Sequence, residues 1–163
     1  MPMLDAYIPA GALQPQAEER LLSDLTGTLI RHEGADPSNP HVRSIAWVFL
    51  HRPAAVLVGG ERPGAPHYRF VTSVPEGQFD EERRRAMVHS ITEAVLDAEG
   101  GAHERDPMRV WVFTREVPDG TWGGGGRIAT LADIATLATG DPERGRAYAE
   151  ERLAARQPRP AVA

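Results

Sequence analysis

The chain of 163 residues contains no cysteine, and all 18 of its basic side chains are arginine. Without cysteine there can be no disulfide, no thiolate nucleophile and no cysteine-ligated zinc or iron–sulfur site. Without lysine there can be no Schiff-base lysine and no phosphate-binding P-loop lysine. The only amine that the chain can supply for chemistry is therefore its own amino terminus.

Long apolar runs and basic stripes are also missing. No run approaches the roughly 20 residues that a membrane-spanning helix needs, and the first residues lack the pattern of a secretory signal. The net charge is −5, which argues against general nucleic-acid binding, and the 41% hydrophobic and 25% charged fractions are typical of a globular domain. We therefore expect a cytoplasmic protein that binds neither nucleic acid nor membranes.

Familiar catalytic and metal-binding motifs are absent as well. The six histidines show neither the His-x-x-x-His nor the His-Glu-x-x-His spacing of a metal site. The four glycines at 123–126 lack the Gly-Lys-Ser/Thr ending of a P-loop and fit a hairpin better. No Gly-x-Ser-x-Gly nucleophile elbow occurs. We expect no metal and no cofactor.

What is present is an internal repeat. Three pairs of segments share a pattern in the same order, 64 to 66 residues apart: 8–13 with 74–79, 46–49 with 110–113, and 58–60 with 122–124. Such a duplication predicts two copies of one supersecondary unit. We expect a single domain over residues 1–140, made of repeats at about 2–63 and 67–128, followed by a C-terminal helix and a disordered tail over 141–163.

Apolar stripes at helical spacing predict one helix in each repeat. The first covers residues 15–33, with Pro15 at its first position and Leu21, Leu25 and Leu29 in its stripe. The second begins after the capping residue Asp80 and ends before Gly100, and its stripe is Val88, Ile91 and Val95, with Met87 beside it. Extended segments are expected over 3–8, 45–50, 68–74 and 110–113, and a short helix or helical turn over 127–139.

The segments 45–50 and 110–113 are apolar at nearly every position, which is typical of strands covered on both faces. We expect an α+β fold in which duplicated β-α-β units form a four-stranded mixed sheet with two helices on one face. Two helices cover only that face, so the simplest cover for the other is another copy of the chain. The alternative is an open monomer whose tail folds over the sheet.

Proline follows the initiator methionine, a context in which the methionine is commonly removed. Pro2 would then be a secondary amine at the chain's start. An α-amino group titrates near 7.7–8.0, and burial lowers that value because it disfavours the charged form. Such an amine could act as a general acid and base near neutral pH. On its own, Met-Pro is more typical of an inert processing site. If Met1 stays, Pro2 is an amide nitrogen that cannot act as a base.

The combination of Pro2 at the head of a strand with a duplicated strand-helix-strand unit resembles the tautomerase superfamily. The resemblance rests on 2–8, 109–113 and 119–124, and it extends over about 2–135. The double length is similar to the cis-3-chloroacrylic acid dehalogenase and malonate semialdehyde decarboxylase groups of that superfamily. The resemblance implies catalysis by the N-terminal proline and a homotrimer assembled through the open sheet face.

The same resemblance implies three substrate-binding residues. Arg109 matches the substrate-binding arginine of the short tautomerases, Trp122 matches their pocket phenylalanine, and Arg127 matches the arginine that closes the hairpin in fused members. Each also has a plain structural alternative. Arg109 could be a solvated strand end, Trp122 could be core or interface packing, and Arg127 could pair with Glu116 or Asp133.

The sequence departs from the dehalogenase and decarboxylase groups at the positions that serve their chemistry. The turn at 73–78 has no arginine pair, Gly124 stands at the water-activating glutamate, and Phe113 stands at a tyrosine. His32 lies about one turn from the position of their helix histidine. These differences disfavour hydrolytic dehalogenation and decarboxylation.

The sequence therefore predicts a tautomerase, that is, an isomerase that uses Pro2 as general acid and base on a small 2-oxo or 2-hydroxydienoic acid. Two alternatives stay open. One is a hydratase, dehalogenase or decarboxylase of a three-carbon acid on the same fold. The other is a non-catalytic binding protein.

Overall fold

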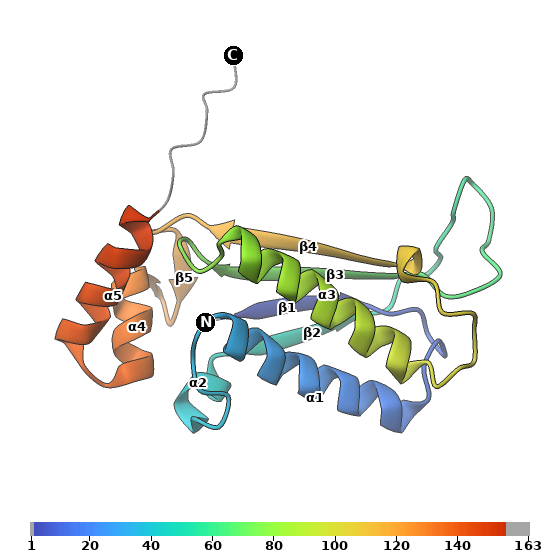
Figure 1. The fold of residues 1–163 in the computed structure, drawn as a ribbon, viewed down its shortest axis with the longest axis horizontal. Helices are drawn as coiled ribbons and strands as arrows, with labels where there is room; N and C mark the ends of the chain where they lie inside the picture. Colours follow the sequence, from blue (N-terminus) through green and yellow to red (C-terminus); the bar gives the residue numbers. More distant parts are fainter. Residues whose placement is uncertain (1, 156–163) are drawn as a thin grey trace, which may run out of the picture.

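The computed structural model describes residues 2–155, which form a four-stranded mixed sheet with two long helices on one face, and a separate two-stranded sheet and two further helices at one end (Figure 1). The tail predicted to be disordered lies outside the described residues. In chain order the elements are β1 (Met3–Tyr7), α1 (Pro15–His32), α2 (Pro40–Ser44), β2 (Trp47–His51), β3 (Tyr68–Pro75), α3 (Glu81–Ala98), the 3-10 turn η1 (Pro107–Arg109), β4 (Val110–Val117), β5 (Trp122–Gly124), β6 (Arg127–Ala129), α4 (Leu131–Thr139) and α5 (Pro142–Ala154).

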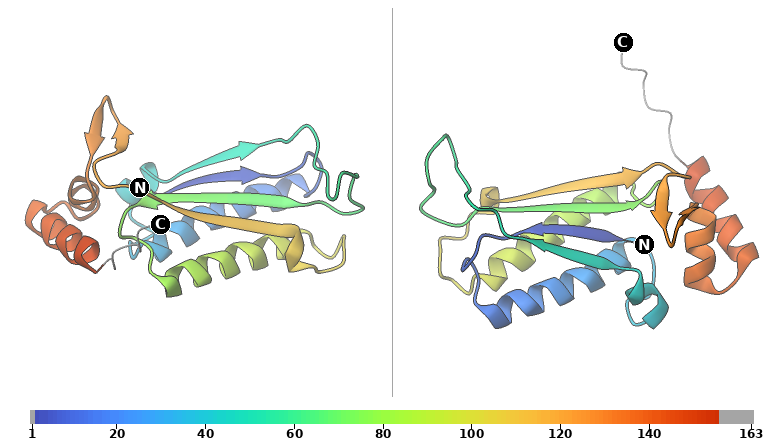
Figure 2. Two further views of the ribbon diagram at one scale, coloured as in Figure 1. Left: turned by 90° about the horizontal axis from the view of Figure 1, so that it is seen from above. Right: turned by 180° about the vertical axis from the view of Figure 1, so that it is seen from behind.

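The main sheet has four strands in the order β2-β1-β3-β4. β1 runs parallel to β2, and β3 runs parallel to β4, each pair being joined through a helix as parallel strands require. The two units meet where β1 and β3 pair antiparallel, from Met3 opposite Ser73 to Tyr7 opposite Arg69. Helices α1 and α3 lie side by side on one face of the sheet (Figures 1 and 2). The predicted α+β architecture is confirmed.

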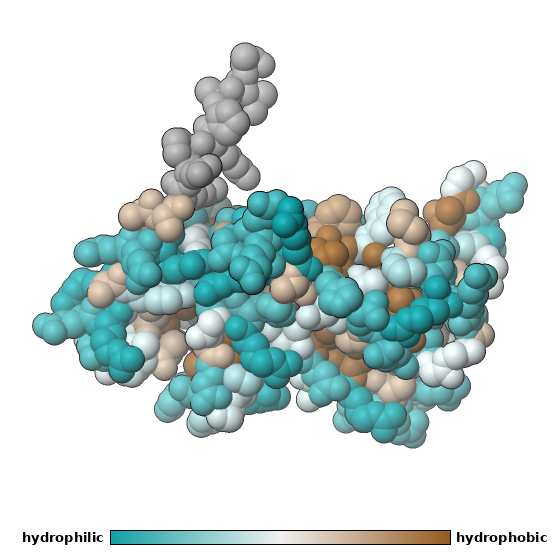
Figure 3. Space-filling view, in the orientation of Figure 1, coloured by the Kyte–Doolittle hydropathy of each residue, from teal (hydrophilic) through white to brown (hydrophobic). Residues whose placement is uncertain are grey.

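The helices form where their apolar stripes meet the sheet. In α1 the predicted stripe of Leu21, Leu25 and Leu29 is buried. In α3 the buried stripe begins at Met87, whereas Val88 is 38% exposed. Met87, Ile91 and Val95 are each four residues apart and share one face, so Val88 points outward and its prediction as a core residue is wrong. The surface over the two helices is largely hydrophilic (Figure 3).

Element boundaries differ from the prediction at three places. The five-residue helix α2, begun by the capping side chain of Asn39 and by Pro40, delays β2 to Trp47. β4 continues to Val117, beyond the predicted end at residue 113. The segment 127–139 begins with strand β6, and α4 starts only at Leu131.

The sheet face away from the helices is apolar along its two outer strands. Trp47 and Phe49 of β2 are 61% and 43% exposed, and Trp111 and Phe113 of β4 are 60% and 44% exposed. A polar cluster lies at one end of this face: His51 of β2 bonds Asp5 of β1 at 2.6 Å and stacks on Tyr7, whose ring lies under Arg69 of β3. Among the described residues, no helix has the length and apolar character needed to cross a membrane.

Candidate active site

A cavity of about 850 Å³ opens where β1 begins. It is enclosed by the start of β1, the ends of β3 and β4, the β5–β6 hairpin and one face of α4. Its lining combines a buried proline, large apolar side chains and one pair of opposite charges: Pro2, Trp47, Trp122, Leu137, Arg127 and Asp133. Such an apolar pocket with few polar groups is the usual setting for a small-molecule site.

Pro2 is held at this cavity by the sheet. Its carbonyl oxygen accepts a hydrogen bond from the backbone N–H of Trp47 at 3.1 Å, which extends the β1–β2 ladder by one residue. The Pro2 ring is buried and lines the cavity. The residue that the sequence proposes as acid and base therefore lies in surroundings that disfavour a positive charge.

The glycine run builds the hairpin that brings Trp122 and Arg127 to the same cavity. Trp122 pairs with Ala129, and Gly124 pairs with Arg127, which leaves a two-residue loop. The loop residues Gly125 and Gly126 have φ values of +59° and +78°, the combination that a type I′ hairpin turn requires and that glycine adopts without strain. Three of the four predicted site residues, Pro2, Trp122 and Arg127, are thus brought together.

Arg109 does not line the cavity. Its side chain is 5% exposed, and its guanidinium donates to both carboxylate oxygens of Glu99 at 2.6 Å and to the carbonyls of Pro66 and Glu104. Glu99 also accepts a hydrogen bond from the Tyr68 hydroxyl at 2.9 Å. Arg109 is therefore neither a solvated strand end nor a side chain free to bind a substrate, because a buried ion pair occupies its donors.

The hydrogen bonds of this buried cluster fix the protonation states of its members. Burial on its own would raise the pKa of Glu99, but hydrogen bonds from Arg109 and Tyr68 outweigh it and hold that pKa below its usual value. Burial, together with the bond to Glu99, raises the pKa of the Tyr68 phenol, which stays protonated. The cluster is thus a neutral phenol with a closed arginine–carboxylate pair.

Helix α4 forms a wall of the cavity that sequence reasoning did not assign to the site. Thr130 caps this helix, and Asp133 completes the capping box by accepting hydrogen bonds from the backbone N–H and the hydroxyl of Thr130, at 2.8 and 2.7 Å, which lower the pKa of Asp133. Ile134 and Leu137 follow on the cavity side of the helix. The Thr-x-x-Asp capping box was the available signal for where this helix begins.

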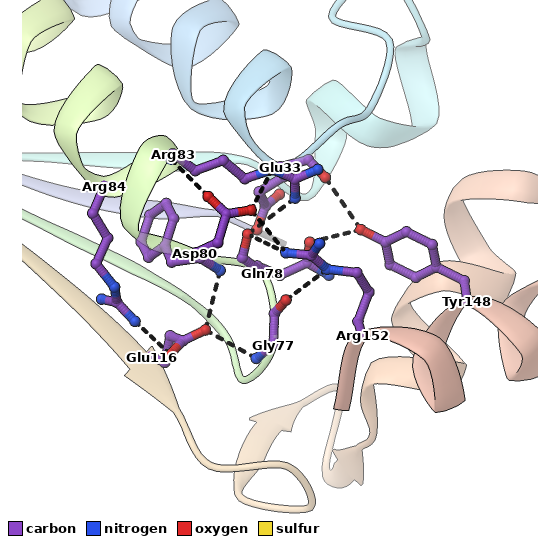
Figure 4. A network of polar contacts seen from close by, with 10 residues as sticks. Glu33, Gly77, Gln78, Asp80, Arg83, Arg84, Glu116, Tyr148 and Arg152 are labelled. Carbon is purple, nitrogen blue, oxygen red and sulfur yellow. Dashed lines mark hydrogen bonds and ion pairs between the residues drawn. The ribbon is translucent and has the colours of Figure 1, made fainter. Parts of the chain in front are cut away.

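Helix α5 ties this end of the molecule to the turn that precedes α3 (Figure 4). Arg152 donates to the carbonyls of Gly77 and Gln78 at 2.7 and 3.1 Å. Tyr148 donates to the side-chain oxygen of Gln78 at 2.9 Å. Gly77 has φ +85°, and a Cβ there would lie 3.2 Å from the backbone oxygen of Arg152, so glycine allows the close approach.

Glu116, an alternative partner for Arg127 by sequence, serves the same turn instead. One of its oxygens accepts the backbone N–H groups of Gly77 and Phe79 at 2.9 and 3.1 Å, and the other pairs with Arg84 at 2.6 Å. Arg127 instead lines the cavity, and the acidic side chain on the same cavity lining is Asp133. Within residues 2–155, no group of three or more histidine, aspartate or glutamate side chains is placed to hold a metal ion.

Comparisons with known proteins agree with this fold. Residues 72–131 match the family described as "Tautomerase enzyme". No curated protein matches the chain. Among solved structures, a fused 4-OT symmetric trimer is 24% identical with a TM-score of 0.62, the match covering 82% of this chain and 98% of that one.

Two further structures share the fold. Pt0534, inactivated by 2-oxo-3-pentynoate, is 21% identical with a TM-score of 0.63, over 78% of this chain and 94% of its own. N1, a member of the cis-3-chloroacrylic acid dehalogenase family, is 19% identical with a TM-score of 0.61, over 92% and 97%. Residues 72–131 therefore match a tautomerase family, and the chain as a whole shares the fold of these structures.

Proposed function

We propose that the protein is a tautomerase that interconverts the enol and keto forms of a small 2-oxo or 2-hydroxydienoic acid, with Pro2 as general acid and base. The observation that carries the proposal is the burial of Pro2 in one cavity with Arg127 and Trp122. Once Met1 is removed, the Pro2 nitrogen is a secondary amine, and the apolar side chains around it favour its neutral form.

Each group on the cavity has a part in the proton transfer. The neutral amine takes the proton from the enol oxygen, and the C–O bond becomes C=O while the C=C electron pair moves toward the neighbouring carbon. The protonated amine then delivers the proton to that carbon, which regenerates the neutral amine. Arg127 binds the substrate carboxylate and stabilises the enolate oxygen, a part that Arg109 cannot take because Glu99 occupies it. Trp122 shields the reaction from water.

Proton transfer is favoured over hydrolytic chemistry by Gly124. This residue lines the cavity and brings no side chain, and by the resemblance in sequence it matches the water-activating glutamate of the dehalogenase group. Among the described residues that line the cavity, the carboxylate is that of Asp133. Hydrogen bonds from Thr130 keep it ionised and hold it at the start of α4.

We also propose that the chain assembles as a homotrimer through the open sheet face. Four large apolar side chains line the outer strands of that face, and a related fused 4-OT is a symmetric trimer. Trp47 belongs both to this face and to the cavity lining, so a neighbouring subunit would complete the cavity.

The test compares the wild type with Pro2→Ala on phenylenolpyruvate and 2-hydroxymuconate. An alanine terminus keeps a primary amine but loses the ring, and loss of a positioned acid–base group costs about 10²- to 10⁴-fold, so a fall in kcat/KM toward the lower end of that range is expected. Equal activity in the two proteins would refute the mechanism. An absence of turnover by the wild type would favour a non-catalytic binding protein.

A further inference from the structure

The internal repeat places two buried glutamates at equivalent positions. Helix α1 begins at Pro15 and α3 begins at Glu81, 66 residues later, and both are 18 residues long. Each helix is followed by a glutamate at its C-cap, Glu33 and Glu99, and both are 8% exposed. A glycine with positive φ comes next in both repeats. The two helix ends are therefore copies of one local structure.

In the second repeat the structure shows which residues this glutamate binds. Glu99 binds Tyr68, the first residue of β3, and Arg109, which immediately precedes β4. It therefore holds together the start of the inner strand and the start of the outer strand of its repeat. Tyr68 lies 66 residues after Pro2, so Pro2 is its equivalent in the first repeat. Strands β2 and β4 are 64 residues apart, and by that interval the equivalent of Arg109 is Ile45.

In the first repeat the equivalent positions around Glu33 are thus Pro2 and Ile45, and both line the cavity. Because α1 runs back along β1 to reach β2, its C-terminal end lies at the end of the sheet where β1 begins (Figure 1). The arginine of the second repeat is replaced by isoleucine. The basic group that the first repeat offers at this place is the amine of Pro2 in the mature chain.

We propose that the carboxylate of Glu33 is the counter-charge of the Pro2 amine and accepts a hydrogen bond from it, as the carboxylate of Glu99 accepts one from Tyr68. Glu33 is then a positioning residue, which orients the Pro2 ring and favours its protonated form against the opposing effect of burial. This inference rests on the proposed function, because it needs the free amine of Pro2.

The other charged groups near Glu33 come from the turn before α3, from α3 and from α5 (Figure 4). Tyr148 donates to the backbone oxygen of Glu33 at 3.3 Å. Burial raises the pKa of the Glu33 carboxyl, so it shares a proton more readily with a neighbouring amine than an exposed carboxylate would. Four other ionisable side chains belong to the same region of the molecule: His32, Asp80, Arg83 and Arg152.

Glu33→Gln tests the proposal, with Glu99→Gln as the matched control. The measurement is the rate at which 2-oxo-3-pentynoate alkylates Pro2 as a function of pH, since only the neutral amine adds to the alkyne. Removing an adjacent opposite charge shifts a pKa by about 1–3 units. We expect the midpoint to fall by about one unit or more in Glu33→Gln and to stay unchanged in Glu99→Gln, and Glu33→Asp should restore it in part.

An unchanged midpoint in folded Glu33→Gln would overturn the proposal, and so would an equal shift in Glu99→Gln. If Glu33→Gln does not fold, NMR titration of the wild type tests the pairing instead. A coupled pair gives the Pro2 nitrogen and the Glu33 carboxyl carbon the same apparent midpoints. Independent midpoints would contradict the pairing. Failure of the proposed function looks different: the wild type would retain Met1 or leave Pro2 unalkylated at every pH.

Discussion

Arg152, near the end of α5, donates its Nε to the backbone oxygen of Gly77 at 2.7 Å, although the two residues are 75 positions apart in the chain. A second nitrogen of the same guanidinium reaches the carbonyl of Gln78. Helix α5 packs on α4, and α4 lines the Pro2 cavity. The contact between Arg152 and the Gly77 turn therefore fixes the position of a cavity wall.

Replacement of Arg152 by alanine should destabilise the protein. Hydrogen bonds from charged groups contribute about 1.5–3 kcal/mol, and the Arg152 side chain is only 18% exposed, so we expect a loss of that order in the free energy of unfolding. Urea denaturation measures it. Arg146→Ala, at an exposed position on the same helix, should change stability by less than about 0.5 kcal/mol. Equal effects of the two substitutions would show that the contact with the turn contributes nothing.

The ion pair between Arg109 and Glu99 should be a stability element rather than a substrate contact. Breaking a buried pair by removing one partner costs about 3–5 kcal/mol, so Arg109→Ala should lower the free energy of unfolding by that order. At a temperature where the variant stays folded, kcat/KM should be nearly that of the wild type. A loss of activity in fully folded Arg109→Ala would instead place Arg109 at the site.

The same pair predicts a pH dependence of stability. The pKa of Glu99 is lower in the folded protein than in the unfolded chain, so its contribution is present above the unfolded value near 4.3 and is lost as pH falls through the folded pKa. The free energy of unfolding should therefore fall with acidification below about pH 4.3. The decrease attributable to this group should disappear in Glu99→Gln, and identical pH profiles would contradict the assignment.

Arg127 should govern substrate binding through its charge. Arg127→Gln removes a charge-assisted hydrogen bond to the substrate carboxylate, and a loss of about 1.5–3 kcal/mol corresponds to a fall in kcat/KM of about 10- to 150-fold. Steady-state kinetics measures this. Arg62→Ala, at an exposed position in the loop before β3, is the control and should leave kcat/KM unchanged. An effect of similar size in both variants would mean that general electrostatics, and not a contact at the cavity, binds the acid.

The open sheet face should carry the assembly. Trp111 is 60% exposed on that face, whereas Val88 is 38% exposed on the outward side of α3. Trp111→Arg should convert the trimer to monomers in native mass spectrometry, and Val88→Arg should not. A wild type that is monomeric at micromolar concentration would contradict the proposed interface.

Local patterns predicted the elements that their own residues determine. Leu21, Leu25 and Leu29 indicated α1, and the duplicated strand-helix-strand pattern indicated the sheet with both helices on one face. Pro2, Trp122 and Arg127 could be named as one site only through the resemblance to a family, because nothing in their spacing shows that they meet.

Contacts between distant segments could not be predicted in this way. The position of Arg109 before a strand is compatible with a free cation, and only the packing of α3 on β4 shows that Glu99 reaches it. The contact of Arg152 with Gly77 depends on how α5 packs against the turn. The part that α4 takes in the cavity depends on the hairpin that precedes it.

The most direct test of the central claim is the intact mass of the purified protein before and after incubation with 2-oxo-3-pentynoate. We expect a mass that lacks Met1, followed by a single covalent addition that peptide mapping places on Pro2 and that abolishes turnover. A chain that retains Met1, or an unmodified Pro2 in a protein that still turns over substrate, would contradict the account.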